Sequence, residues 1–241
     1  MRNTNKDYLD VSRYENKYLI SQVAACNIKR IFSQVLSPDV HNGLNGYMVR
    51  SVYFDSYDDS DYFDKENGYN CRKKIRLRIY SSDSEYAKLE KKEKYGAHQW
   101  KRSLKIAKSD ALKLIDGDFT PLLKYDSMFA FEVYEIMTIG IYRPRCTVEY
   151  DRTAFIVNEN ETRLTLDSNI RASETDFNIF SPEMNLCPVC NPDDVTLEVK
   201  FSNFLISYVK DMLAVCDKKQ ISKSKYVMGR SVSRFSTDNY I

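Results

Sequence analysis

Residues 72–80 read RKKIRLRIY and carry the clearest chemical signal in this sequence. Lys74, Arg76 and Arg78 alternate with aliphatic residues, which is the period of a β-strand with one cationic and one aliphatic face. Lysine and arginine bind phosphate through charge-assisted hydrogen bonds, so a row of them can bind a polyanion. The pattern allows two arrangements. Either the cations meet solvent and the aliphatic face is core, or the cations line a closed, water-filled barrel that helices cover from outside.

The same alternation recurs along the chain. Further strands are predicted at residues 13–20, 86–93, 99–106, 145–156, 163–167 and 195–201. Glutamates accompany the cations on three of these strands, at Glu15, Glu90 and Glu198. Such a carboxylate suits a divalent cation that is held jointly with phosphate oxygens, or it neutralises a neighbouring lysine, as Glu198 could do with Lys200. From the pattern alone, a cationic tunnel and a solvated sheet both remain open.

Helical segments that could cover such a barrel are also present. Helices are predicted at residues 21–36, 60–67, 109–115, 121–139 and 203–215. Ser21 is the expected N-cap of the first helix, and residues 121–139 are apolar enough to predict burial on more than one side. Residues 47–55 form a strongly β-prone segment whose facing is ambiguous, because Arg50 lies on the phase opposite to its polar neighbours. Trp100 shares the aliphatic phase of its strand and is expected in the outer core.

Composition limits the classes of function. The 241 residues are 43% hydrophobic and 29% charged, with a formal net charge of +2, so bulk charge predicts no nucleic-acid partner. Residues 1–10 lack the apolar region of a signal peptide, and no apolar run approaches the length of a membrane span. The six cysteines include Cys187 and Cys190, whose spacing favours a turn with two free thiols over a zinc site. The expected compartment is the reducing cytoplasm.

A set of short motifs stands in an ordered series along the chain. They are RYENKY at 13–18, RSVYFD at 50–55, KIRLR at 74–78, LEKK at 89–92, RP at 143–144, YDR at 150–152, RLTLD at 163–167, LEVK at 197–200 and SKY at 224–226. This series resembles the VTC domain, the catalytic domain of the vacuolar transporter chaperone polyphosphate polymerase and a branch of the triphosphate tunnel metalloenzymes. The resemblance covers about residues 13–229, and we expect one such domain over residues 1–241.

The resemblance implies an α+β fold, an eight-stranded antiparallel tunnel barrel with a cationic interior and helices packed on the outside. It also implies transfer of the ATP γ-phosphate to a growing polyphosphate chain, dependent on Mn²⁺ or Mg²⁺. ATP, triphosphate and polyphosphate are the implied ligands. The sequence leaves open whether a membrane protein receives the product.

The resemblance also implies roles for individual residues. Those expected to act on the transferred phosphate are Arg76, Arg78, Lys92, Arg152, Arg163 and Lys200. Those expected to bind substrate are Lys17, Lys101, Tyr150, Ser224 and Lys225, and Glu198 is the expected metal ligand. If Tyr150 and Arg152 face inward, strict alternation turns Glu149 outward, so a bulge or a salt-bridged exterior is needed there.

Three other functions compete with the polymerase. A triphosphatase of the same superfamily would use water as the acceptor, and a binding module would hold polyphosphate without turnover. A nucleic-acid-binding sheet has the least support, because it needs exposed aromatic residues among the cations and the cationic strands carry aliphatic residues instead.

Overall fold

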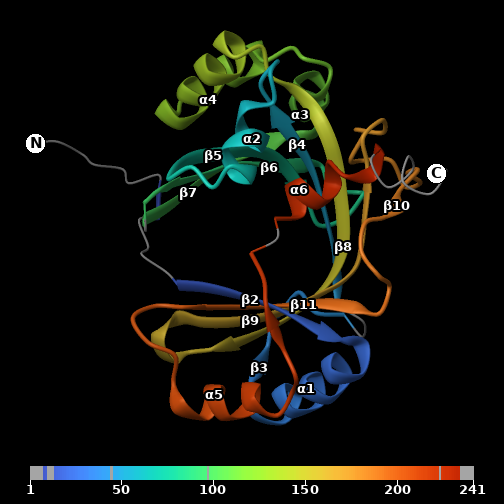
Figure 1. Cartoon of the computed structure of the whole chain (residues 1–241). Coiled ribbons are helices and arrows are strands. Elements are labelled where there is room, and N and C mark those ends of the chain that lie inside the picture. The colour runs from blue at the N-terminus through green and yellow to red at the C-terminus, as the bar shows by residue number, and fades with distance from the viewer. Residues whose placement is uncertain (1–7, 10–13, 44–45, 97, 223, 234–241) are drawn as a thin grey trace, which may run out of the picture.

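The computed structural model describes residues 8–9, 14–43, 46–96, 98–222 and 224–233. A large antiparallel sheet is its central feature (Figure 1). The eight long strands are β2 (Tyr14–Ser21), β4 (Tyr47–Asp55), β5 (Cys71–Ile79), β6 (Tyr86–Tyr95), β7 (His98–Ala107), β8 (Arg143–Val157), β9 (Thr162–Ser173) and β11 (Asp194–Phe201). The short strands are β1 (Tyr8–Leu9), β3 (Ser37–Pro38), β10 (Cys187–Pro188) and β12 (Lys219–Gln220).

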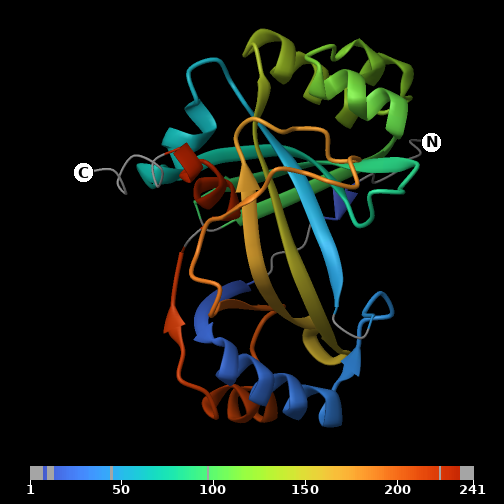
Figure 2. The same cartoon turned by 90° about the vertical axis from the view of Figure 1, so that its right-hand side faces the viewer.

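The long strands follow one another in the order β7-β6-β5-β4-β8-β9-β11-β2, and the curved sheet encloses a central space (Figures 1 and 2). In the described part of the chain, no ladder joins β7 to β2, and the short strands β1 and β12 pair with these two edges. An ion pair of 2.9 Å between Lys92 of β6 and Glu15 of β2 joins two walls of the sheet. The predicted eight-stranded antiparallel tunnel fold is therefore confirmed, with a seam between β7 and β2 that no backbone ladder of the described residues closes.

The aliphatic phase of the cationic strand faces outward, under helices. Ile75, Leu77 and Ile79 are at most 1% exposed and belong to the core beneath α3 (Lys108–Ile115), the 3₁₀ helix η1 (Thr120–Lys124) and α4 (Met128–Ile139). Burying these side chains supplies the main driving force for wrapping the sheet, at about 1.5–3 kcal/mol for each residue. The covered outside decides between the two arrangements that the sequence allowed, in favour of an enclosed cationic face.

A second pair of helices covers the opposite wall of the tunnel. Helices α1 (Gln22–Val35) and α5 (Ser207–Ala214) pack over the outer side of β2, β9 and β11 (Figure 1). Ser21 caps α1 by accepting a hydrogen bond of 3.2 Å from the backbone N–H of Ala24, as predicted.

The apolar segment at residues 121–139 differs from its prediction in two ways. The predicted single helix is interrupted after η1, and α4 begins with Ser127 as its N-cap. Burial on more than one side was also a wrong prediction for α4, because Met128 is 83% exposed and Ile139 is 81% exposed. Glu132 of α4 pairs with Lys91 and Arg102 of the sheet, so polar contacts as well as apolar packing hold this helix.

The ambiguous strand β4 has a mixed facing. Ser51 and Tyr53 point toward the tunnel, where they contact arginines of β5. Arg50 points outward and donates to Glu149, with 2.6 Å between Nε and Oε2. The β8–β9 ladder shifts its register between Glu149 and Asp151, so the structure contains both the predicted bulge and a salt-bridged exterior.

The short helices α2 (Ser60–Glu66) and α6 (Lys225–Gly229) lie at one end of the tunnel (Figure 1). Tyr226 of α6 is 1% exposed and packs with inward-facing residues of β4 and β8. A Cβ atom at Gly229 would lie 2.6 Å from a methyl group of Val148, so only glycine permits this close approach. Helix α6 therefore fills part of the concave face, which leaves the remainder as the cavity.

Candidate functional site

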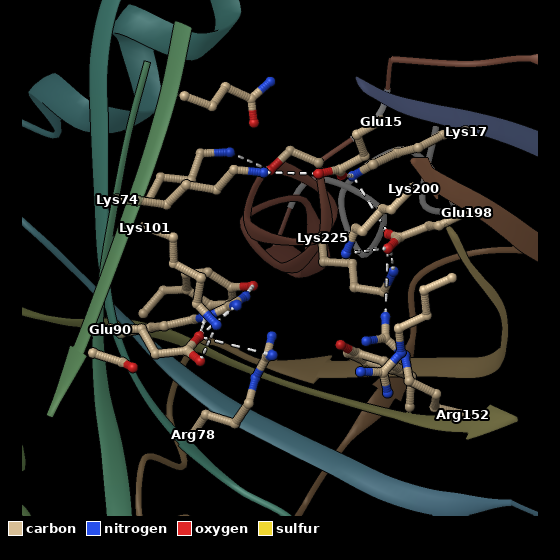
Figure 3. A pocket seen from close by; sticks show the side chains of 18 of the residues that line it. Glu15, Lys17, Lys74, Arg78, Glu90, Lys101, Arg152, Glu198, Lys200 and Lys225 are labelled. Atoms are coloured by element: carbon tan, nitrogen blue, oxygen red, sulfur yellow. Dashed lines mark hydrogen bonds and ion pairs between the residues drawn. The ribbon is translucent and has the colours of Figure 1, made fainter. Parts of the chain in front are cut away.

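The concave face of the sheet surrounds a cavity of about 510 Å³ (Figure 3). Ten lysines and arginines and four glutamates of the described chain line it, which gives the cavity a net positive charge. The twelve residues that the sequence resemblance indicated all line this cavity: Lys17, Arg76, Arg78, Lys92, Lys101, Tyr150, Arg152, Arg163, Glu198, Lys200, Ser224 and Lys225. Their placement supports the site, and their individual roles stay predictions.

Glu90 organises the cations of β5 and β7. Its carboxylate accepts hydrogen bonds from Arg76 Nε at 2.7 Å and from Lys101 Nζ at 2.5 Å, and Arg78 lies at 3.8 Å. Burial alone would raise the pKa of Glu90, but Arg76, Arg78 and Lys101 lower it well below its usual range. Glu90 is therefore a permanent anion that holds these three cations in place.

Glu198 organises the opposite wall of the tunnel. Four cations surround its carboxylate: Lys225 at 3.2 Å, Lys200 at 3.3 Å, and Lys17 and Arg152 at 3.5 Å each. Burial alone would raise the pKa of Glu198, but the lysines and the arginine lower it well below its usual range. Because β11 pairs with β2, Glu198 stands directly opposite Lys17, as the alternating pattern requires.

Asp167 is a site residue that the sequence reasoning left without a role. It is fully buried and accepts from Arg152 at 2.6 and 2.7 Å and from Lys225 at 2.5 Å. This bidentate pair fixes the direction of the Arg152 guanidinium. The sequence did contain a signal for Asp167, because this residue lies on the same strand face as Arg163 and is the last residue of the RLTLD motif.

Lys74 and two tyrosines were also missed. Lys74 has the same phase as Arg76 and lines the cavity, and Tyr53 accepts from Arg76 NH1 at 2.9 Å. Tyr47 accepts from Arg163 NH2 at 3.1 Å. Tyrosine hydroxyls on a tunnel wall could not be predicted from alternation, because the same residues suit an apolar core.

The prediction that Trp100 belongs to the outer core was wrong. Its ring stacks on His98, with 5.9 Å between ring centroids, and Trp100 is among the residues that line the cavity. It lies on β7 near the open seam, where its register partner on β6 is the charged Glu93, and it is not among the described residues of the core under α3 and α4.

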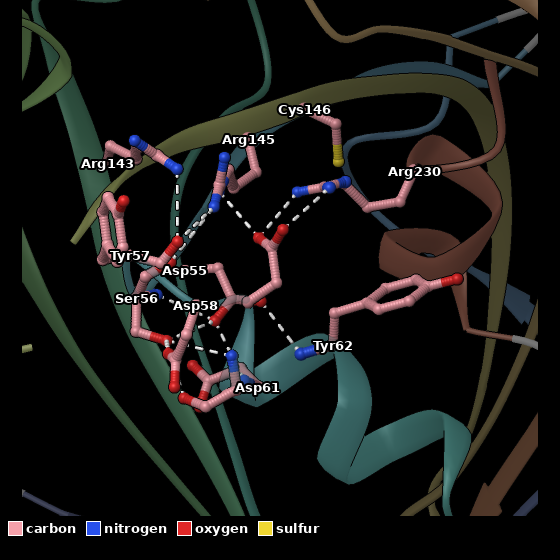
Figure 4. Close-up of polar contacts among 12 residues, drawn as sticks. Asp55, Ser56, Tyr57, Asp58, Asp61, Tyr62, Arg143, Arg145, Cys146 and Arg230 are labelled. Carbon is pink, nitrogen blue, oxygen red and sulfur yellow. Dashed lines mark hydrogen bonds and ion pairs between the residues drawn. The ribbon is translucent and has the colours of Figure 1, made fainter. Parts of the chain in front are cut away.

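A buried carboxylate network outside the cavity positions α6 (Figure 4). Asp55 accepts from the backbone N–H groups of Ser56, Asp61 and Tyr62, at 2.8 to 2.9 Å, and from the Tyr226 hydroxyl. Asp55 therefore joins the end of β4 to the first turn of α2 and to α6. Because Tyr226 follows Lys225 directly, the same contact fixes the helix that brings Lys225 to Asp167 and Glu198.

Tyr226→Phe is expected to lower the free energy of unfolding by about 1–3 kcal/mol, because Asp55 would lose its one side-chain donor from α6. Urea unfolding measures this change. Tyr208→Phe is the matched control, since the Tyr208 hydroxyl makes a longer contact, of 3.4 Å, with exposed Glu159. Equal stabilities of the two variants would contradict the anchoring role of Tyr226.

A metal ion fits this site only together with phosphate. The described residues contain no cluster of three or more histidine, cysteine or acidic side chains that could hold a metal by themselves. Glu198 is a charged carboxylate inside the cavity, and Mg²⁺ is usually bound by one or two carboxylates plus substrate phosphates and water. The donor set thus fits a divalent cation that shares its coordination between Glu198 and the polyanion.

The fold and the lining of the cavity define a class of protein, the triphosphate tunnel proteins. Comparison with protein families matches residues 12–234 to the VTC domain. The chain therefore belongs to the VTC domain family. Comparison with curated proteins finds no match.

A solved structure shares the fold of this chain at low sequence identity. The proposed adenylyl cyclase HpAC1 from Hippeastrum, described as having a dominant triphosphatase activity, is 14% identical, with a TM-score of 0.57 over 90% of this chain and 94% of that one. A proposed adenylate cyclase from Bacillus halodurans is also 14% identical, with a TM-score of 0.46 over 96% and 93% of the two chains. In the described part of this chain, no helix is long and apolar enough to cross a membrane.

Proposed function

We propose that this chain is an ATP-dependent polyphosphate polymerase that transfers the ATP γ-phosphate to a growing polyphosphate chain. The observation that carries the proposal is the continuous cationic lining of an enclosed cavity in a VTC domain. A linear polyanion can run along such a lining and exchange contacts from one phosphate to the next. We expect the activity in the cytoplasm, a reducing compartment.

Phosphoryl transfer requires positioning and charge neutralisation more than covalent help from the protein. Arg76 and Arg78, held by Glu90, would bind the transferring phosphate from one wall of the tunnel. Arg152, held by Asp167, would bind it from the other wall. These cations are already oriented by buried carboxylates, so little reorganisation accompanies the reaction, which is the condition for strong electrostatic stabilisation of the transition state.

Lys92, Arg163 and Lys200 would assist these arginines in binding the transferring phosphate. The remaining residues of the resemblance would hold the chain and the metal. Further phosphates along the cavity would contact Lys17, Lys101, Tyr150, Ser224 and Lys225. Glu198 would hold Mn²⁺ or Mg²⁺. When bound, the metal would neutralise phosphate charge and orient the phosphate oxygens.

A triphosphatase is the second candidate, because HpAC1 has the same fold and is described with that activity. The two functions differ in the acceptor, which is a phosphate chain in one case and water in the other. Incubation of the protein with ATP and Mn²⁺ separates them, with products resolved by gel electrophoresis and by a phosphate assay. Long chains are expected from the polymerase. Orthophosphate alone would establish the triphosphatase, and tight polyphosphate binding without ATP consumption would indicate a binding module.

A further inference from the structure

Lys74 differs from the other cations of the tunnel in its partners. Lys17, Lys92, Lys101, Lys200 and Lys225 each form an ion pair with a carboxylate, and so do Arg76, Arg78, Arg152 and Arg163. Within the described residues, Lys74 has no carboxylate partner at ion-pair distance. Among these residues, its side-chain polar contact is a hydrogen bond of 2.6 Å from Nζ to the hydroxyl of Ser224.

The surroundings of Lys74 are unusually positive. The charged groups that act on it come from four elements: Lys17 of β2, Lys65 of α2, Arg76 of β5 and Lys92 of β6. Glu15 of β2, an acidic residue that also lines the cavity, is paired with Lys17 and Lys92. Burial, followed by repulsion from these cations, lowers the pKa of Lys74 to about 7.

A bound polyanion would reverse this situation. Negatively charged oxygens beside Lys74 favour its ammonium form, and the Ser224 hydroxyl beside it can donate to the same phosphate. Lys74 is half-buried and lines the cavity, so a phosphate can reach it without rearrangement of the sheet. The other lysines have carboxylates to satisfy them before substrate arrives, whereas Lys74 has its full charge-pairing capacity available.

We propose that Lys74 and the Ser224 hydroxyl form a further phosphate-binding position at the α6 end of the tunnel, and that Lys74 takes up a proton when a polyphosphate chain binds there. The proton comes from the buffer, and no covalent bond to phosphorus is made or broken in this step. The inference rests on the proposed function only in its choice of ligand, a chain of linked phosphates.

The sign of the pH dependence follows from this proton uptake. Below pH about 7, Lys74 is already charged and binding needs no proton. Above that pH, binding takes up about one proton at Lys74, so affinity falls as pH rises, by up to about tenfold for each pH unit. The fall ends above the higher pKa that Lys74 has in the complex.

Calorimetric titration with inorganic tripolyphosphate tests the proposal, in EDTA at pH 8 and in two buffers of different ionisation enthalpy. Wild-type protein is expected to take up more protons than Lys74→Arg, by about one for each ligand bound, because arginine is always charged. Burial lowers the pKa of Lys101 to about 8. Proton uptake by Lys101 is the same in both proteins, so it cancels in the difference. Lys17→Arg is the matched control, and its proton uptake is expected to equal that of wild type. Burial alone would lower the pKa of Lys17, but Glu198 and Glu15 outweigh it and raise this pKa, so Lys17 is already charged at pH 8.

Equal proton uptake by wild type and Lys74→Arg would overturn the inference. A second measurement is independent of any folding defect in the variant: NMR of ¹⁵N-labelled lysine side chains should place the Lys74 midpoint near neutral pH in the free protein and at least one unit higher with tripolyphosphate. A free-protein midpoint near 10 would also overturn it. Lys74→Ala should weaken metal-free binding by about 10- to 100-fold.

Failure of this inference is distinguishable from failure of the proposed function. The titration contains no metal and needs no turnover. A protein that shows the Lys74 effect but makes no polyphosphate from ATP would overturn the polymerase proposal alone. A protein that does not bind tripolyphosphate at all would overturn both.

Discussion

Glu198→Gln is expected to lower metal-dependent turnover by at least two orders of magnitude while metal-free binding of polyphosphate is kept or strengthened. Glutamine has the size of glutamate and a neutral acceptor, but it lacks the charge that a hard divalent cation requires. At the same time, Lys17, Lys200 and Lys225 lose an anionic partner and become more available to phosphate. Turnover across a Mn²⁺ titration, measured beside metal-free affinity, checks both parts.

The alternative role of Glu198 gives a different result. If its carboxylate only pairs with lysines, the metal requirement of Glu198→Gln would match that of wild type and turnover would change little. Near-normal activity at the usual Mn²⁺ concentration would therefore remove Glu198 from the metal site. Glu159→Gln is the control for loss of one carboxylate, since Glu159 is exposed and lies outside the residues that line the cavity.

Arg76→Ala is expected to lose about 2–4 kcal/mol of transition-state stabilisation. This loss corresponds to a roughly 30- to 1000-fold lower kcat/KM. The fold should persist, because the outer face of β5 makes the core contacts and Glu90 keeps Arg78 and Lys101 as partners. Arg72→Ala is the matched control on the same strand and phase. Arg72 donates to the carbonyl oxygen of Tyr69 and does not line the cavity.

Steady-state kinetics and thermal melting of Arg76→Ala together distinguish a catalytic role of Arg76 from a structural one. The catalytic role predicts a small shift in Tm with a large loss of kcat/KM. A collapse of Tm with normal turnover of the remaining folded protein would make Arg76 a structural charge, and the phosphate-binding role of the tunnel would then lose its main support.

Much of the fold could be predicted because the side chains of a β-strand point to alternate faces, with a period of two residues. The alternation of Lys74, Arg76 and Arg78 with aliphatic residues determined which side chains share a face. The N-cap at Ser21 was likewise visible, since it depends on contacts between residues close in the chain. The same reasoning failed for residues 121–139, where apolar density did not reveal the break before Ser127 or the exposed side of α4.

The alternation could not determine which face of the sheet is enclosed, because a solvated sheet and a cationic tunnel have the same pattern. That choice depends on the curvature of all eight strands and on the helices that cover the aliphatic side. The sequence indicated that a bulge or a salt-bridged exterior near Tyr150 was needed if Tyr150 and Arg152 face inward. The position of the bulge could not be predicted, because the pairing of β8 with β9 decides where the extra residue lies.

By itself the sequence determined the faces of the strands, and with the ordered motifs it indicated the twelve residues that now line one cavity. The pairing of charges was decided only by the tertiary structure. Lys74 and Ser224 are 150 positions apart, and Asp55 and Tyr226 are 171 apart, yet each pair is joined by a hydrogen bond. Periodicity describes neighbours along a strand, whereas the free energy of a buried charge depends on which distant groups the fold brings beside it. That is why the sequence could place Lys74 on the cationic face but could not reveal that it lacks a carboxylate partner there.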